Sequence, residues 1–381
     1  MVVYNENHET PFSKKGHVIY EKANFFIDSR YEIQRILGKG SYGTVCSAID
    51  KKVKDSTRPS EIAIKKVSNI FTKEVLLKRA VRELRLMRHF KGHKNIVSLI
   101  DIDIVYIKPF DGLYCFQELI EYDLARVIQS SVQFSEFHIK SFLYQLLCGL
   151  KYIHSAEVIH RDLKPGNVLC TMQGILKICD FGLARGICPS YLRKSTSIIT
   201  NYVATRWYRA PELILSKRSY SKPVDMWAIG CIFAELYGRR PLFIGNDQLN
   251  QITEIIKVLG TPPEEAISKY GSRMAWEFFS PPKPQYQAIP WCDIYAHISN
   301  EAADLLEHLI CWDISRRYSV EKALDHSFLK SIRDTNNEPS CKQPFDFSFE
   351  NTETTLPDLK VILQKEVESF RVERSGNKIH S

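Results

Sequence analysis

The chain has 381 residues, of which 44% are hydrophobic and 25% charged, and its formal net charge is +8 at pH 7. Its basic residues form short pairs such as Lys14-Lys15 and Arg239-Arg240 rather than one long block, so we expect no nucleic-acid-binding surface. The ten cysteines include no Cys-x-x-Cys pair, and no apolar run is long enough to span a membrane. We therefore expect an intracellular protein, cytoplasmic or nuclear, with reduced cysteines and no membrane partner.

The N-terminal part of the chain contains a glycine-rich segment after an irregular start. Residues 1–30 show no clear period, which predicts a tail, with ordered structure beginning near Tyr31. Residues 37–45 read Leu-Gly-Lys-Gly-Ser-Tyr-Gly-Thr-Val between two strand-like runs, and glycines lacking a Cβ atom let a backbone fold over phosphates. Dinucleotide-binding folds share the three glycines, but they open a helix after the last one, whereas Val45–Ile49 continues as a strand. The segment is therefore predicted to cover the phosphates of a nucleotide.

A lysine on the next strand is paired in our prediction with a glutamate on a helix. Ile62–Lys66 reads as a strand, in which Lys65 and Lys66 face opposite ways. We expect Lys65 to bind the α- and β-phosphates. Apolar residues then recur at helical spacing, at Leu77, Ala80, Val81, Leu84 and Met87. Glu83 lies beside this stripe, where it could pair with Lys65 or simply face solvent.

Three short motifs follow in a fixed order in the middle of the chain. They are His160-Arg161-Asp162-Leu163-Lys164-Pro165-Gly166-Asn167, Asp180-Phe181-Gly182 and Ala210-Pro211-Glu212. Each motif alone is common at turns, but the series is typical of phosphoryl transfer. Asp162 can accept the proton of an attacking hydroxyl, and Lys164 can neutralise the moving phosphoryl group. Asn167 and Asp180 offer the hard oxygen ligands that Mg²⁺ prefers.

The segments around these motifs predict a mainly helical scaffold. Ser135 is the expected N-cap of a long helix that leads to the first motif. The helix at Asp225–Phe233 is apolar on nearly all sides, so we expect it to be buried. Gly260–Pro263 and Ser280–Pro284 predict turn-rich connections. Near the end, Phe345, Phe347 and Phe349 are spaced more closely than a disordered tail would have them, and the helical pattern of Leu356 to Phe370 follows.

Together the motifs resemble those of protein kinases. Thr200-Asn201-Tyr202, just before Val203–Arg209, resembles in particular the activation segment of the mitogen-activated protein (MAP) kinases, and the resemblance covers roughly Tyr31 to Phe370. It implies an α+β class and the bilobal protein-kinase fold, with a β-rich N-terminal lobe and a mainly α-helical C-terminal lobe. The implied limits are an N-terminal tail at 1–30, a kinase domain at 31–329, made of a small lobe at 31–121 and a large lobe with the MAP-kinase insert at 122–329, and a C-terminal extension at 330–381 that packs back on the small lobe.

The resemblance also implies ATP and Mg²⁺ as cofactors and assigns residues to each task. Catalytic roles fall to Lys65, Glu83, Asp162 and Lys164, and magnesium binding to Asn167 and Asp180. Nucleotide contacts fall to Leu37, Gly38, Gly40, Gly43, Val45, Ala63, Lys65, Gln117, Glu118, Ile120 and Leu169. Asp225 would hold the backbone around Asp162, and Arg317 would pair with Glu212.

In the family that the Thr-Asn-Tyr segment resembles, phosphorylation of both hydroxyls activates the enzyme. Here the acceptors would be Thr200 and Tyr202, and the arginines placed to receive the phosphates would be Arg82, Arg161, Arg185, Arg206 and Arg209. The implied activity is that of a proline-directed serine/threonine protein kinase that works as a monomer on proteins with Ser/Thr-Pro sites. Its activator would be another kinase or a dedicated activator protein.

Several features resemble the sporulation-specific MAP kinases of fungi in particular, among them Phe90–Val97, the Gly166 that replaces the usual serine, and the middle residue Asn201. This implies a role in meiotic development and spore wall assembly. Two other readings compete. A pseudokinase scaffold would have lost Lys65, Asp162 or Asp180, and all three are present. A cyclin-dependent kinase would lack the Tyr beside Thr200 and would carry a cyclin-binding motif around Glu83.

Many MAP kinases attract basic docking peptides through an acidic cluster after the catalytic domain. The matching segment here is Arg333–Pro339, where Asp334 and Glu338 keep the acidic pattern but Asn337 replaces an acid and Arg333 adds a positive charge. Exposed ion pairs contribute only about 0–1 kcal/mol each, so docking needs several acting together. We therefore expect weak binding of basic docking peptides and activation through a dedicated partner.

Overall fold

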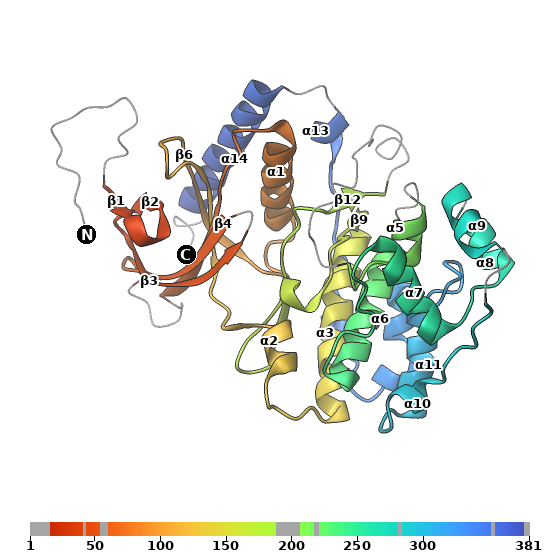
Figure 1. Cartoon of the computed structure of the whole chain (residues 1–381). Helices are drawn as coiled ribbons and strands as arrows, with labels where there is room; N and C mark the ends of the chain where they lie inside the picture. The colour runs from red at the N-terminus through yellow and green to blue at the C-terminus, as the bar shows by residue number, and fades with distance from the viewer. Residues whose placement is uncertain are drawn as a thin grey trace. The chain divides into compact units, whose positions relative to one another are not determined.

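The computed structural model describes residues 16–40, 43–53, 60–187, 206–216, 221–270, 272–280, 284–351 and 355–376. The chain divides into two compact units (Figure 1). The first consists of Met1–Gly92, Val97–Ile120 and Ser348–Ser381, and the second of His93–Ile96 and Glu121–Phe347. Within the described ranges, every helix is too short or too polar to span a lipid bilayer.

The first unit is built on a five-stranded antiparallel sheet in the order β3-β4-β5-β7-β6. Its strands are β3 (Tyr31–Gly40), β4 (Gly43–Asp50), β5 (Glu61–Val67), β6 (Leu99–Val105) and β7 (Gly112–Glu118). Burial alternates along β5, where Ile62, Ile64 and Lys66 are buried and Lys65 lies on the opposite face. The predicted opposition of the two lysines is confirmed.

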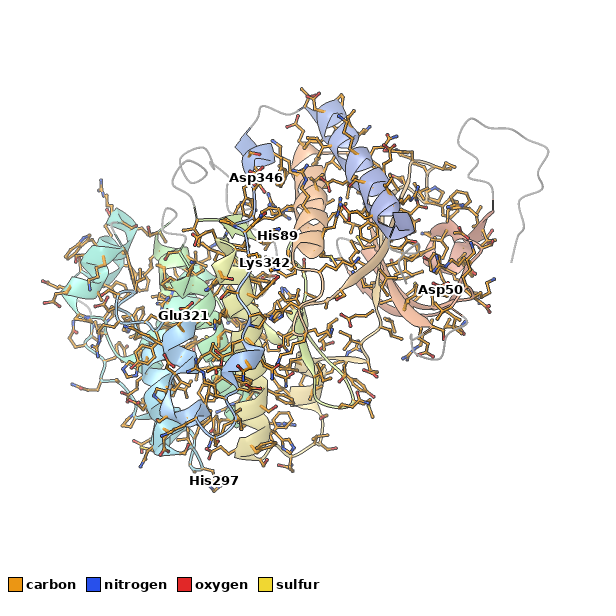
Figure 2. The ribbon with its side chains drawn as sticks, turned by 180° about the vertical axis from the view of Figure 1, so that it is seen from behind. Asp50, His89, His297, Glu321, Lys342 and Asp346 are labelled. Carbon is orange, nitrogen blue, oxygen red and sulfur yellow. The ribbon has the colours of Figure 1, made fainter. Side chains whose placement is uncertain are left out.

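Two helices from distant parts of the sequence accompany this sheet. Helix α1 (Glu74–His89) buries the predicted stripe of Leu77, Val81 and Leu84. Helix α14 (Leu356–Gly376) packs against α1 and β6. Seen from either side, α14 lies alongside α1 (Figure 1 and Figure 2). The last part of the chain therefore completes the unit that the first part begins.

A hairpin precedes Tyr31, where the sequence predicted a tail. It consists of β1 (His17–Tyr20), the 3₁₀ turn η1 (Glu21–Ala23) and β2 (Phe25–Asp28), which pairs antiparallel with β1. Its apolar run enters the same hydrophobic cluster as Tyr114 and Phe116 of β7. Lys66 Nζ donates hydrogen bonds to the carbonyl oxygens of Asn24 (2.8 Å) and Pro109 (3.1 Å). The prediction of a tail is wrong for residues 16–30, because burial of this short apolar run outweighs its lack of a period.

The second unit is mainly helical, with α3 (Glu136–Ser155) packed on α6 (Pro223–Gly238). Ser135 caps α3, since its hydroxyl accepts from the His138 amide while its own amide donates to His138 Nδ1 at 3.1 Å. Helix α6 is buried from Val224 to Leu236. Both predictions, the N-cap and the buried helix, are confirmed.

Shorter elements complete the second unit. Among the residues that the structure describes, its other helices and 3₁₀ turns are α2 (Leu124–Gln129), η2 (Pro165–Asn167), α5 (Pro211–Leu215), α7 (Gln248–Leu259), α8 (Glu264–Lys269), α9 (Arg273–Phe279), α10 (Trp291–Ile294), α11 (Asn300–Leu309), α12 (Val320–Leu324), η3 (Ser327–Leu329) and η4 (Thr335–Asn337). One small sheet orders β11 (Leu176–Ile178), β10 (Val168–Cys170) and β8 (Tyr122–Asp123), and another pairs β12 (Arg185–Gly186) with β9 (Val158–Ile159). The α+β class, with one β-rich and one helical unit, is as predicted.

The C-terminal extension is divided between the units. In the second unit, the Phe345 amide donates to the Ala156 carbonyl at 2.9 Å, and the Phe347 ring lies so close to Gly186 that a Cβ there would meet it at 2.6 Å. The short helix α13 (Ser348–Asn351) and α14 belong to the first unit. All three phenylalanines are buried, which confirms an ordered segment. We expected the whole extension on the small lobe, whereas residues 330–347 pack within the second unit.

Candidate active site

In the first unit, Lys65 and Glu83 form a direct ion pair. Lys65 Nζ on β5 lies 2.5 Å from Glu83 Oε1 on α1. Glu83 is only 8% exposed, which excludes the alternative of a solvated surface glutamate. Ala63 lies two residues earlier on the same strand, opposite Gln117 of β7. The central strands of the sheet thus hold the lysine in a fixed position, and the helix holds its counter-charge.

The glycine-rich segment is the tip of the β3–β4 hairpin, whose last described pair is Gly40 with Gly43. A Cβ atom at Gly43 would lie 1.8 Å from the Lys66 carbonyl oxygen, so the close strand approach requires glycine there. At Gly38 and Gly40 an added Cβ would have no heavy atom within 4 Å. The backbone between Leu37 and Gly40 is thus open on this side.

The end of β7 and the residues that follow it carry the remaining predicted adenine-binding residues of the first unit. The Glu118 amide donates to the Ser98 carbonyl at 3.3 Å, and its carboxylate accepts from the Ser98 amide at 2.7 Å. Any hydrogen bond from Glu118 to adenine would therefore use its carbonyl oxygen. Gln117 and Ile120 are both buried.

In the second unit, Asp162 lies at the centre of a set of charge-assisted hydrogen bonds. Its Oδ2 accepts from Lys164 Nζ at 2.7 Å and from Asn167 Nδ2 at 2.8 Å. Asn167 Nδ2 also donates to the Asp162 carbonyl at 2.8 Å. Next to it, His160 Nε2 lies 3.1 Å from the Cys179 carbonyl, and its Nδ1 lies 3.3 Å from the Asp162 amide. Since the carbonyl can only accept and the amide can only donate, Nε2 is the donor and Nδ1 the acceptor in these two contacts.

Asp225 at the start of α6 binds the backbone of the loop that carries Asp162. It is buried, and its carboxylate accepts from the amides of His160 and Arg161, each at 2.8 Å, and from His154 Nε2 at 2.9 Å. Burial alone would raise the pKa of Asp225, but these hydrogen bonds and the charge of His154 outweigh it, so the pKa lies below its ordinary value. Arg161 has a left-handed backbone with φ +69°. Such strain persists only where the surroundings fix it, here through Asp225.

Asp180 is positioned by the same loop. The amide of the preceding Cys179 donates to the Asn167 carbonyl at 3.0 Å, which places the two predicted magnesium ligands on neighbouring backbone segments. Asp180 has φ +67°, another left-handed residue at this site. The side-chain nitrogen Nδ2 of Asn167 donates to Asp162, so the side-chain oxygen Oδ1 of Asn167 is the atom that could bind a metal. An amide oxygen beside a carboxylate is a donor set that fits Mg²⁺.

Comparison with known proteins identifies the family of this chain. Residues 31–329 match the family model described as the protein kinase domain. The chain is 56% identical, over 366 residues, to the sporulation-specific mitogen-activated protein kinase SMK1 of Saccharomyces cerevisiae, a match that covers 95% of this chain and 94% of the relative. This chain belongs to the MAP kinase family. It is also 44% identical to the mitogen-activated protein kinase SLT2/MPK1 of the same yeast (92% of this chain, 71% of the relative) and 45% identical to the mitogen-activated protein kinase spm1 of Schizosaccharomyces pombe (94% and 84%). It is thus an ATP-dependent serine/threonine protein kinase.

The five arginines predicted to receive phosphates are in different surroundings in this MAP kinase. Thr200 and Tyr202, the predicted acceptors, lie outside the described residues. Arg82 of α1 pairs with Glu350 of α13, both in the first unit. In the second unit, the guanidinium groups of three others donate to backbone carbonyls: Arg161 to Leu183 (3.2 Å), Arg185 to Ala184 (2.8 Å) and Arg206 to Asn246 (2.6 Å). The Arg209 amide donates to the Arg206 carbonyl. Phosphate binding by these arginines stays a prediction.

Two buried pairs stabilise the segment Tyr208–Glu212 of the kinase. Arg317 donates to both carboxylate oxygens of Glu212, at 2.6 and 3.2 Å, which is the predicted partnership. Sequence reasoning missed the second pair, in which the Tyr208 hydroxyl donates to Glu235 Oε2 at 2.5 Å. Burial raises the pKa of Glu235 to about 6, against the lowering effect of this bond. No local motif links these two residues, which lie 27 positions apart.

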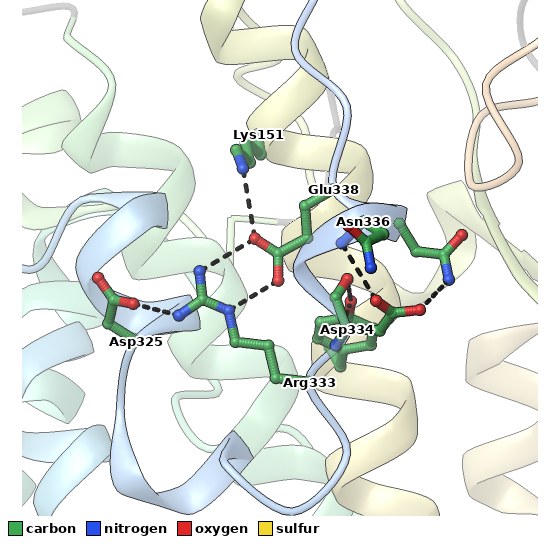
Figure 3. Close-up of polar contacts among 8 residues, drawn as sticks. Lys151, Asp325, Arg333, Asp334, Asn336 and Glu338 are labelled. Carbon is green, nitrogen blue, oxygen red and sulfur yellow. Dashed lines mark hydrogen bonds and ion pairs between the residues drawn. The ribbon is translucent and has the colours of Figure 1, made fainter.

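The predicted docking segment of the kinase is internally paired (Figure 3). The Glu338 carboxylate is buried, accepts from Arg333 at 2.8 and 3.1 Å, and also binds Lys151 at 3.3 Å. Asp334 accepts from the amide of Asn336 and the side chain of Asn337. Arg333 also pairs with Asp325. Both acids that keep the pattern are therefore engaged by neighbours of the same unit.

Proposed function

We propose that this MAP kinase transfers the γ-phosphate of ATP to serine or threonine residues that precede proline. The observation that carries the proposal is the Asp162 carboxylate, held by Lys164 and Asn167 on a loop that Asp225 anchors. In this role Asp162 accepts the proton of the acceptor hydroxyl, and Lys164 neutralises charge on the moving phosphoryl group. Bound Mg²⁺ would supply positive charge to the β- and γ-phosphates, with Asn167 and Asp180 as its protein ligands.

We propose that the residues predicted from the sequence bind the ATP. Lys65, kept in place by Glu83, would contact the α- and β-phosphates, and the open backbone at Gly38 and Gly40 would cover them. The carbonyl of Glu118 would accept from adenine. The further proposed nucleotide contacts are Leu37, Gly43, Val45, Ala63, Gln117, Ile120 and Leu169.

We propose activation by phosphorylation of Thr200 and Tyr202. Two phosphates add about −3 to −4 charges, and charge of that size beside arginines orders a loop. The basic side chains proposed to receive them are Arg82, Arg161, Arg185, Arg206 and Arg209. The 56% identity to a sporulation-specific relative supports a role in sporulation and spore wall assembly. The pairing of Glu338 with Arg333 supports activation by a dedicated partner rather than through basic docking peptides.

Phosphorylation of a peptide array by purified, doubly phosphorylated protein tests activity and sequence preference together. Peptides with Ser-Pro or Thr-Pro should be favoured, and the Asp162→Asn variant should lose the signal while keeping its fold by circular dichroism. A surface variant such as Arg273→Gln, at a side chain that is 91% exposed, serves as the matched control. Transfer by Asp162→Asn at the wild-type rate would contradict the mechanism, and equal use of sites without proline would contradict the proposed preference.

A further inference from the structure

Several lysines of the second unit lie near Tyr152 of α3. The Tyr152 ring lies 4.6 Å from the ring of His93, measured between their centres, and the exposed Lys94 directly follows His93. Strand β11, which carries Lys177, runs beside the same segment and is hydrogen-bonded to it. Burial and the charges of Lys94 and Lys177 together lower the pKa of His93 to about 4. Both lysines are therefore close to this ring.

Two further lysines reach the same region from α3 and from the C-terminal extension. Lys151 directly precedes Tyr152 on α3. The Cys341 amide donates to Ser155 Oγ at 2.8 Å, and burial together with Cys341 raises the pKa of Tyr152, so Cys341 lies beside this tyrosine. The exposed Lys342 is the next residue. We call Lys94, Lys151, Lys177 and Lys342 the lysine cluster.

The acids of the neighbouring docking segment do not neutralise the lysine cluster. Glu338 is buried and is shared between Lys151 (3.3 Å) and Arg333 (2.8 Å), as Figure 3 shows. The other acid of the segment binds the amide groups of two asparagines. Among the described residues, the ammonium groups of Lys94 and Lys342 donate no hydrogen bond and form no ion pair. Four lysines beside two internally bound acids give this surface a net positive charge.

We propose that the lysine cluster is a docking surface for an acidic segment of a partner protein, in which several Asp or Glu side chains follow one another. The inference deepens the proposed activation by a dedicated partner and rests on it. Single exposed ion pairs are weak, so an acidic segment needs several cations within its reach. The lysine cluster supplies them from four parts of one folded unit, which the packing around Tyr152 brings together. The same charges repel a basic peptide.

The test measures the fluorescence anisotropy of fluorescein-labelled hexaglutamate with the purified full chain, and of fluorescein-labelled hexalysine as the peptide of opposite charge. We expect hexaglutamate to bind more tightly, with an affinity that falls as salt is added. Lys94→Gln/Lys342→Gln should weaken this binding roughly fivefold, whereas Lys94→Arg/Lys342→Arg, which keeps the charge, should bind like wild type. The matched control is Lys51→Gln/Lys365→Gln, which removes the same charge from exposed lysines of the first unit and should also bind like wild type.

Equal affinity for the two peptides, or an equal loss of hexaglutamate binding in the control variant, would overturn the inference, because overall charge alone would then account for binding. A single-stranded hexanucleotide that binds more tightly than hexaglutamate would also overturn it, since the surface would then favour phosphates. Circular dichroism and wild-type turnover of a short Ser-Pro peptide check that Lys94→Gln/Lys342→Gln is folded with an intact active site. Binding needs no phosphoryl transfer, so an inactive wild type in the peptide array would refute the proposed function, while the anisotropy still decides on the docking surface.

Discussion

Asp180 combines a strained backbone with a predicted metal-binding role. Removing its carboxylate withdraws charge that would hold Mg²⁺ in the transition state, so Asp180→Ala should raise the barrier by several kcal/mol, about a thousandfold in rate per 4 kcal/mol. The measurement is kcat with a generic acceptor peptide. Folding should survive, since alanine replaces a partly exposed side chain. A folded Asp180→Ala protein with near wild-type turnover would be incompatible with the assigned role.

Glu235 is a buried acid whose pKa is raised to about 6 by burial. A raised pKa means that this group stabilises the fold fully below its ordinary value, near 4.5, and that this stability is lost as the pH rises through about 6. Glu235→Gln cannot ionise but still accepts from the Tyr208 hydroxyl. We expect it to raise the free energy of unfolding at pH 7.5 by roughly 1–2 kcal/mol. Urea unfolding at pH 7.5 and pH 4.5 checks this, with the gain confined to the higher pH.

The pKa of Asp225 is shifted in the opposite direction to that of Glu235, so its contribution to stability depends on pH in the opposite way. Its pKa is lowered, so its contribution to stability is present above the ordinary pKa of 3.8 and is lost as the pH falls through the folded value. Asp225→Asn leaves the amides of His160 and Arg161 with a weaker, uncharged acceptor. We expect both a loss of stability of roughly 2–3 kcal/mol at pH 7 and a lower kcat. Thermal melts and kinetics on the same sample measure both, and an unchanged kcat in the folded variant would argue against Asp225 as the anchor of the loop.

At the scale of the elements, the ion pairs of the docking segment Arg333–Pro339 explain why we expect it to bind basic peptides weakly. Glu338 is already bound by Arg333 and Lys151, so a basic peptide would have to displace them. We expect weak binding of such a peptide to wild type at physiological salt and a several-fold gain in affinity in Arg333→Gln. The measurement is a fluorescence titration, with Arg273→Gln as the control. Low-micromolar binding by wild type that disappears in Asp334→Asn/Glu338→Gln would show that the acidic site is open.

Local patterns in the sequence were enough to predict several of the elements but not every contact between them. The cap at Ser135 and the stripe at Leu77, Val81 and Leu84 follow from spacing within one helix. The pairing of Lys65 with Glu83 was predicted from a lysine on a strand and a glutamate beside the apolar stripe of the next helix. By contrast, Arg82 meets Glu350 across 268 positions, and no spacing rule connects them. The hairpin before Tyr31 was missed for the same reason, because its core partners are on β7.

At the scale of the whole molecule, that hairpin makes residues 17–28 part of the first unit. Phe25 and Ile27 are fully buried, and burying side chains of this size contributes about 1.5–3 kcal/mol each. A chain that begins at Tyr31 should therefore lose roughly 3–6 kcal/mol of stability. Thermal unfolding compared with a chain that begins at Gly16 measures the loss. Equal melting temperatures would show that the hairpin adds little to the fold.

The discontinuous first unit also has a consequence for how the protein is made. Its sheet and α1 leave the ribosome early, but α13 and α14, which carry the acidic partners of the α1 arginines, are synthesised only after the whole of the second unit. Domains that are continuous in sequence can fold while the rest of the chain is still being translated. Here the second unit is synthesised while the first still lacks its final helix. The first unit therefore reaches its complete set of contacts only after residues 348–376 have been translated, and a ribosome stalled before residue 348 holds a kinase whose α1 arginines have no extension to bind.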